Sequence, residues 1–268
     1  MRADGYLRYV ALGDSQTEGV GDEDATGTPR GWADRLAGRL VRHNPEARYA
    51  NLAVRGRLAG QVRAEQLPSA LALRPDLATV VAGVNDLLRP RCDVDEVAGE
   101  LEAMCVALTA QGARVATLTF PDITRLIPLA RPVSSRVLAL NARIRELSAR
   151  HGIACAETEP HAVVSDPRLW EPDRLHASPF GHQRIAAAMG HALGLPCCDD
   201  SWTRPLPPPV TPAPTGLRAV AGEARWAAAF LGPWVGRRLR GRSSGDGRTA
   251  KRPELLPIGE LPPVPEPG

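Results

Sequence analysis

Ser15 is the residue of this sequence best placed to act as a nucleophile. It lies in the segment 13–19 (GDSQTEG), which directly follows an apolar run that predicts a buried strand. Glycines on both sides allow a tight turn, and they let a substrate approach the hydroxyl and the backbone N–H of Ser15. A second interpretation stays equally open from this segment alone, since Ser15 or Asp14 also suits the cap of the next helix.

A serine hydroxyl needs a base to take its proton, so a histidine with an acidic partner is the next feature to find. The tetrapeptide Asp173-Arg174-Leu175-His176 offers this pair between the last predicted strand and the last predicted helix. On one turn, the Asp173 carboxylate would fix the tautomer of the His176 imidazole. Taken alone the pattern is a weak signal, because an aspartate that caps a helix and a histidine on the surface would give the same Asp-x-x-His sequence.

The oxyanion formed by nucleophilic attack needs donors that are already in position. Gly56 ends the segment that follows the second predicted strand, and its backbone N–H would be unobstructed. Asn85 follows the third predicted strand, in Gly83-Val84-Asn85-Asp86, and can donate a side-chain N–H. Each is an ordinary turn by itself. Ser15, Gly56, Asn85 and His176 nevertheless follow one another in this order at successive strand ends, which favours one shared site.

Such a site requires a fold that brings strand ends together. Short apolar runs alternate with longer amphipathic stretches from residue 6 to about 195, which predicts repeated βα units and a parallel sheet with helices on both faces. Five strands are expected, at 7–12, 48–53, 77–82, 114–119 and 153–156. Helices are expected near 31–42, 58–72, 93–110, 132–150 and 179–193. Open α/β sheets bind their ligands at the carboxyl ends of the strands.

The ordered set of motifs resembles the SGNH hydrolases, also called GDSL-like lipases and esterases. Gly13-Asp14-Ser15 matches the first block, Gly56 the second, Gly83-x-Asn85-Asp86 the third and Asp173-x-x-His176 the last, over roughly residues 6–194. The resemblance implies a three-layer α/β/α sandwich similar to flavodoxin, with a mainly parallel five-stranded sheet. It also implies a catalytic triad of Ser15, Asp173 and His176. The oxyanion hole would then comprise the backbone N–H groups of Ser15 and Gly56 and the side-chain amide of Asn85.

By this resemblance the protein is a serine hydrolase that cleaves carboxylic esters through an acyl-enzyme intermediate, with neither a metal nor an organic cofactor. Esterase, lipase and thioesterase activities stay open, because the small-molecule or lipid-like ester substrate would be selected by loops such as 20–31 and 121–133. One departure from the family pattern is Gln16, which stands where the family often has leucine. This substitution puts substrate preference in doubt more than catalysis.

Composition argues against several other classes of function. The net charge is only +3, and the arginines of residues 1–200 are interleaved with acids, so no nucleic-acid partner is expected. No segment approaches the roughly 20 apolar residues of a membrane-spanning helix, and no signal-peptide pattern opens the chain, so we expect a cytoplasmic protein. The five cysteines are irregularly spaced and do not indicate a disulfide framework. Rossmann, P-loop and Gly-x-Ser-x-Gly motifs are missing around Ser15.

The sequence changes in composition after the hydrolase domain, which is expected at 1–198. Prolines predict an extended linker at 199–215, residues 216–242 predict an amphipathic helical segment, and 243–268 is expected to be a disordered tail. The tryptophans and arginines of 216–242 suit packing on the protein itself, which we prefer, or a peripheral membrane contact. The alternative function is therefore an inactive SGNH-fold binding module that docks on a membrane or a partner through 216–242.

Overall fold

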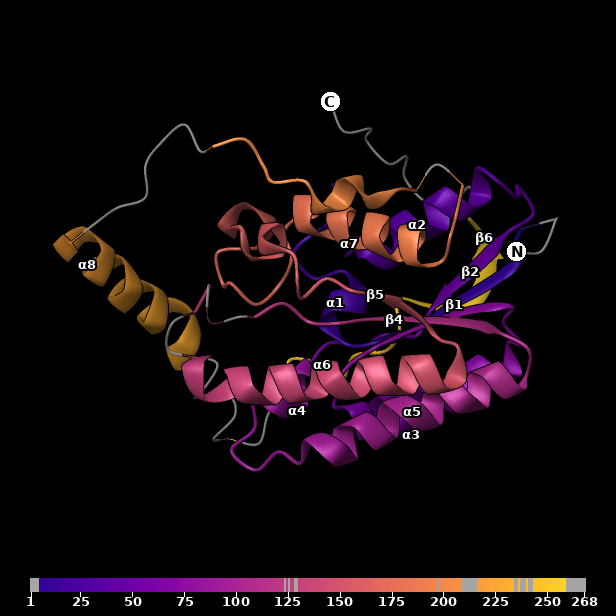
Figure 1. The fold of residues 1–268 in the computed structure, drawn as a ribbon, viewed down its shortest axis with the longest axis horizontal. Coiled ribbons are helices and arrows are strands. Elements are labelled where there is room, and N and C mark those ends of the chain that lie inside the picture. Colours follow the sequence, from indigo (N-terminus) through magenta and orange to yellow (C-terminus); the bar gives the residue numbers. More distant parts are fainter. Residues whose placement is uncertain are drawn as a thin grey trace.

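A mostly parallel six-stranded sheet forms the centre of the molecule (Figure 1). The structure is a computed structural model that describes residues 5–122, 124, 126–127, 130–196, 198–208, 216–233, 236, 240 and 243–258. Within these residues the strand order is β5 (Ala154–Ala156), β4 (Arg114–Leu118), β3 (Leu77–Val81), β1 (Arg8–Gly13), β2 (Arg48–Asn51) and β6 (Arg252–Pro257). The first five strands in the chain pair in parallel, and β6 runs antiparallel to β2.

Helices cover both faces of this sheet. In Figure 1, α2 (Gly31–Val41) and α7 (Pro179–Ala192) lie on one face, and α3 (Ala59–Ala72), α5 (Val94–Ala110) and α6 (Arg131–His151) lie on the other. Two one-turn helices, α1 (Ser15–Glu18) and α4 (Val84–Leu87), directly follow β1 and β3. The expected three-layer α/β/α sandwich is thus confirmed. Short 3₁₀ turns occupy Ala162–Ser165, Pro167–Leu169 and Asp200–Thr203.

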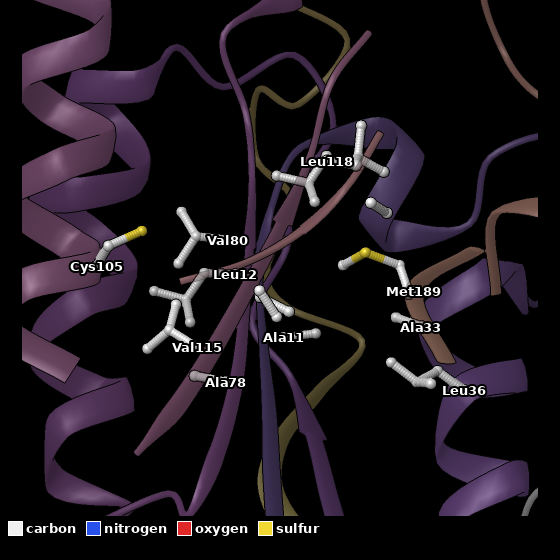
Figure 2. Packing of buried hydrophobic residues seen from close by; sticks show 14 of the residues in the cluster. Ala11, Leu12, Ala33, Leu36, Ala78, Val80, Cys105, Val115, Leu118 and Met189 are labelled. Carbon is white, nitrogen blue, oxygen red and sulfur yellow. The ribbon is translucent and has the colours of Figure 1, made fainter. Parts of the chain in front are cut away.

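The core lies on both sides of the sheet, which explains why the inner strands β1, β3 and β4 are mostly apolar. Figure 2 shows Leu12 pointing toward Cys105 of α5, whereas its neighbour Ala11 points toward Leu36 of α2 and Met189 of α7. All of these side chains are buried. Because successive strand residues face opposite layers, each strand contributes to both halves of the core.

The helix ends follow local sequence signals. The Asp93 side chain accepts hydrogen bonds from the first backbone N–H groups of α5, and Ser178 does the same for Gly181 of α7. Gly152 ends α6 with a positive φ of 64°, a conformation that glycine adopts without steric cost. These caps fix where each helix begins or ends relative to the strand beside it. Beyond the sandwich, α8 (Gly216–Trp226) continues into a π-helical turn at Ala227–Leu231.

Two expectations drawn from the sequence are corrected by β6. The sheet has six strands in place of five, and the sixth comes from the tail that was expected to be disordered. The reason is that the open edge of β2 supplies backbone partners that the tail's composition does not reveal. Trp234 and residues 209–215 and 259–268 lie outside the described residues, so the proposed linker and the other domain boundaries stay predictions. Across the described segments, no helix has the length and apolarity that crossing a membrane requires.

Candidate active site

Ser15 lies at the first turn after β1, at the carboxyl edge of the sheet. It begins α1 and is 9% exposed. Asp14 caps this helix by accepting a hydrogen bond from the backbone N–H of Gln16 at 3.3 Å, so the capping role falls to Asp14 and leaves the Ser15 hydroxyl for other chemistry. A Cβ at Gly13 would overlap Thr17 and the Val81 carbonyl oxygen, so the turn requires glycine there.

Asp173 and His176 form the hydrogen-bonded pair that the sequence predicted. The imidazole Nδ1 lies 2.6 Å from Oδ2 of Asp173. The other carboxylate oxygen accepts the backbone N–H groups of Leu175 and His176, each at 2.9 Å. Three hydrogen bonds therefore fix the carboxylate, and the carboxylate fixes the imidazole ring.

Gln16 connects the serine turn to the histidine loop. Its side-chain Nε2 donates to the Leu175 carbonyl at 2.8 Å, and its Oε1 accepts from the Ala177 N–H at 3.3 Å. These two backbone groups flank His176 on either side. One amide thus holds the residue after Ser15 against the loop that carries His176, although the two segments are far apart in the sequence.

Asn85 and Gly56 lie at the neighbouring strand ends. The Asn85 Nδ2 donates to Asp14 Oδ2 and to the Arg57 carbonyl, each at 3.1 Å. These bonds join the turn after β3 to the turn after β1 and to the residue next to Gly56. Gly56 has a φ of +77°, a left-handed conformation that favours glycine. Hydrogen bonds therefore connect all four sequence blocks at one edge of the sheet.

The two aspartates of the site differ in their electrostatics. Burial of Asp14 raises its pKa to about 7, against the lowering effect of hydrogen bonds from Gln16 and Asn85 and of the nearby His176. Burial also acts to raise the pKa of Asp173, but the hydrogen bonds and charge of His176 outweigh it, and this pKa lies below its usual value. Asp173 is consequently the carboxylate that stays ionised beside the imidazole at neutral pH. Among the described residues, no three acidic, histidine or cysteine side chains cluster as ligands for a metal.

The sequence matches the model of the GDSL-like lipase/acylhydrolase family over residues 11–184. The chain belongs to this family. Its match includes Ser15, Gly56, Asn85 and both members of the Asp173–His176 pair. Membership places the protein among the hydrolases of the lipase and esterase class. No curated protein sequence matched the chain.

Solved structures share the fold of this GDSL-like protein. A mutant of Axe2, an acetyl xylan esterase from Geobacillus stearothermophilus, has a TM-score of 0.61 at 18% identity, covering 73% of this chain and 98% of that one. The enzyme LAE5 from the metagenome of Lake Arreo has a TM-score of 0.58 at 22% identity, covering 72% of this chain and 97% of that one. The psychrotrophic esterase EstA from Pseudoalteromonas sp. has a TM-score of 0.55 at 16% identity, covering 70% of this chain and 96% of that one. Nearly all of each neighbour is matched while a quarter or more of this chain is left over.

Sequence reasoning missed two parts of this GDSL-like site. Gln16 was noticed only as a departure from the family pattern, although a polar amide beside a buried strand end signals a hydrogen-bonding role. The second part is Glu18, whose carboxylate accepts three hydrogen bonds from Arg55: one from the backbone N–H at 2.6 Å and two from the guanidinium at 2.9 and 2.7 Å. No sequence signal links these two residues, because their contact depends on the packing of α1 against the turn after β2.

Proposed function

We propose that this GDSL-like protein is a serine hydrolase that cleaves carboxylic esters, with Ser15 as nucleophile and His176 as base. The observation that carries the proposal is the Asp173–His176 pair, bonded at 2.6 Å and held beside the serine turn by Gln16. An imidazole fixed in this way by a carboxylate is suited to take a proton from a serine hydroxyl.

The reaction follows from the protonation states of these groups. Ser15 Oγ attacks the acyl carbonyl while His176 accepts the hydroxyl proton, and the ionised Asp173 stabilises the imidazolium. The imidazolium then donates this proton to the leaving alcohol, which leaves an acyl-enzyme. Water enters by the same route: His176 takes a proton from it as its oxygen attacks the acyl carbon, and then returns that proton to Ser15 Oγ as the acid is released.

The negative charge that develops on the carbonyl oxygen would be stabilised by the Ser15 and Gly56 backbone N–H groups and the Asn85 amide. In the free protein the two N–H groups of the Asn85 amide donate to Asp14 Oδ2 and to the Arg57 carbonyl, so one of them must turn from its partner to the oxyanion. Losing one oxyanion donor typically costs 10²–10³ in kcat.

An apolar cavity next to the site supports an acyl substrate. The cavity has a volume of about 80 Å³, and its wall includes Gln16, Leu175 and Ala177 from the site, together with Phe120 and Trp202. A single water needs only about 10–15 Å³ of such volume, so the space suits a short hydrocarbon chain. We therefore expect uncharged short- or medium-chain acyl groups to be preferred over acyl groups that carry a charge.

The test is intact-mass analysis after fluorophosphonate treatment, together with hydrolysis of short- and medium-chain p-nitrophenyl esters. Wild type should gain one adduct and hydrolyse the esters, whereas Ser15→Ala should do neither, because the nucleophile is gone. Ser69→Ala, the same change at an exposed position of α3, is the matched control and should behave as wild type.

A wild-type protein that neither forms the adduct nor turns over any ester would overturn this assignment. The result would then favour the inactive binding module as the function. Ester turnover that persists in Ser15→Ala would instead show that another group is the nucleophile.

A further inference from the structure

A segment outside the family match lies directly against the oxyanion glycine. We call residues 243–258 the C-terminal strap. A Cβ built on Gly56 would overlap the Ser243 hydroxyl and would lie 3.0 Å from the hydroxyl of Ser244. The Ser243 Oγ also donates a hydrogen bond of 3.4 Å to the Gly56 carbonyl. The strap therefore packs on the α-carbon of Gly56 itself.

The contact extends to the residue before Gly56. A Cβ on Gly245 would overlap the Arg55 carbonyl oxygen and would lie 3.3 Å from Cγ1 of Val54. Glycine at position 245 is thus what lets the two backbones approach. The strap turn is itself ordered, because Ser243 N donates to Asp246 Oδ2 at 2.8 Å and Gly245 N donates to Ser243 Oγ at 3.2 Å.

The strap is anchored to the sandwich at two further points. Lys251, the single lysine of the chain, inserts its ammonium group among Asp34 Oδ2 at 2.5 Å and the carbonyls of Pro29 and Arg30 at 2.7 and 2.8 Å. Residues of β6 then pair with β2, which is the strand whose end leads to Gly56. These anchors determine where the Ser243–Gly245 turn lies relative to the site.

The opposite side of the same loop is held by α1. Glu18 binds both the backbone and the guanidinium of Arg55, and its side chain is 9% exposed. The loop 54–56 is therefore enclosed between the helix that begins at Ser15 and the C-terminal strap. A backbone segment held from two sides keeps its N–H directions fixed.

We infer that the C-terminal strap is part of the active site, with Ser243 and Gly245 acting as positioning residues for the Gly56 N–H of the oxyanion hole. The inference rests on the proposed function, since the donor matters only if an oxyanion forms. The family match ends at residue 184, so the strap lies outside the part of the chain that carries the shared catalytic blocks.

The inference predicts a specific kinetic change. Displacing Gly56 weakens a donor that acts on the transition state and leaves the acyl cavity and the Asp173–His176 pair in place, so kcat falls and KM changes little. A Cβ at position 245 would overlap the Arg55 carbonyl oxygen, so Gly245→Ala forces the strap and the loop 54–56 apart and should lower kcat about 10- to 100-fold. Ser243→Ala removes only side-chain hydrogen bonds and should lower kcat about three- to tenfold.

The experiment measures kcat and KM for a p-nitrophenyl ester in the full-length chain, with kcat expressed per fluorophosphonate-labelled site. The control is Glu254→Ala, at an exposed position of β6 on the strap itself, which should match wild type. The rate of phosphonylation should fall together with kcat, while the shape of the pH profile of kcat/KM should stay as in wild type. A thermal unfolding midpoint is recorded for each variant.

The outcomes separate this inference from the proposed function. A wild type without an adduct or turnover would contradict the hydrolase assignment itself. If wild type is active but Gly245→Ala and Ser243→Ala retain its kcat per labelled site within about twofold, the strap does not position the donor, even if their unfolding midpoints fall. Loss of kcat in Ser243→Ala with an unchanged KM and midpoint would support the inference.

Discussion

Among single residues, Gln16 makes the connection on which the proposed triad most depends. Asp173 orients the imidazole within its own loop, but it does not set the distance between that loop and Ser15. The Gln16 amide supplies this link through backbone groups on both sides of His176. A positioning residue of this kind acts on the rate without contacting the substrate's reacting atoms.

Replacing Gln16 with leucine should therefore impair the reaction. Gln16→Leu keeps a similar volume and loses both hydrogen bonds, so we expect kcat/KM for ester hydrolysis to fall about tenfold, equivalent to ~1.4 kcal/mol. Gln111→Leu, at an exposed position after α5, serves as the matched control. Unchanged kinetics in Gln16→Leu would mean that other contacts position His176.

The residues of the site illustrate what sequence can and cannot predict. Ser15, Gly56, Asn85 and His176 were found because each follows a strand, and the carboxyl ends of parallel strands meet at one edge. Glu18 and Ser243 were not found, because their partners lie on loops whose approach depends on the three-dimensional packing. The roles of all these residues in catalysis stay predictions.

Among the secondary-structure elements, α8 is the one whose sequence left two interpretations open. The structure gives it an intramolecular partner: Glu223 pairs with Arg174 at 2.7 Å, and the Arg174 guanidinium lies 4.8 Å from the centre of the Trp226 ring. Trp226 is 8% exposed. Arg174 lies between Asp173 and His176, so α8 contacts the histidine loop. This arrangement agrees with the preferred packing of the segment on its own protein.

Trp226→Ala should then destabilise the protein. The partly exposed Glu223–Arg174 pair contributes about 0–1 kcal/mol, but the buried indole contributes packing and a cation–π contact, so we expect a loss of about 2 kcal/mol in the free energy of unfolding. Urea unfolding measures this loss, with the more exposed Phe230→Ala as control. If Trp226→Ala left stability unchanged and reduced sedimentation with anionic vesicles, α8 would be a membrane-docking helix.

The elements of the sandwich were predictable for a physical reason that does not extend to the tail. Long amphipathic helices and fully buried strands have clear hydrophobic periodicity, and α2, α3, α5, α6 and α7 all begin or end within about two residues of the expected bounds. The strand β6 contains prolines and exposed residues and has no such pattern. It forms because β2 offers an open edge, which is a property of the folded sheet.

For the whole molecule, two buried ionisable groups make opposite contributions to stability as pH changes. Burial lowers the pKa of His182 to about 4, with Arg35 and Lys251 adding to this effect and the Val20 carbonyl and Asp22 opposing it. Its Nδ1 accepts the Trp32 N–H at 3.1 Å, so the folded protein holds the ring neutral. Burial of Asp14 raises that pKa to about 7, so the folded protein holds this group protonated in mildly acidic solution.

The signs follow from which state binds more protons. Between pH 4 and 6.5 the unfolded chain protonates His182 and the folded chain does not, so this residue makes stability fall as pH decreases. Asp14 does the reverse, because the unfolded chain loses its proton near pH 4 and the folded chain keeps it up to about pH 7. Each contribution amounts to roughly 3–4 kcal/mol over its range, and the two largely cancel in wild type.

Replacing either residue alone should reveal how the other changes the free energy of unfolding with pH. His182→Gln removes one contribution, so its stability relative to wild type should fall by roughly 3 kcal/mol between pH 4 and 7, and Asp14→Asn should gain a similar amount over the same interval. Urea unfolding at several pH values measures both, with the exposed His43→Gln as control for the loss of a histidine. Curves that ran parallel to wild type would mean that these groups titrate alike in the folded and unfolded chains. Opposite slopes would show that burial keeps Asp14 protonated and His182 neutral in the folded protein over this pH range.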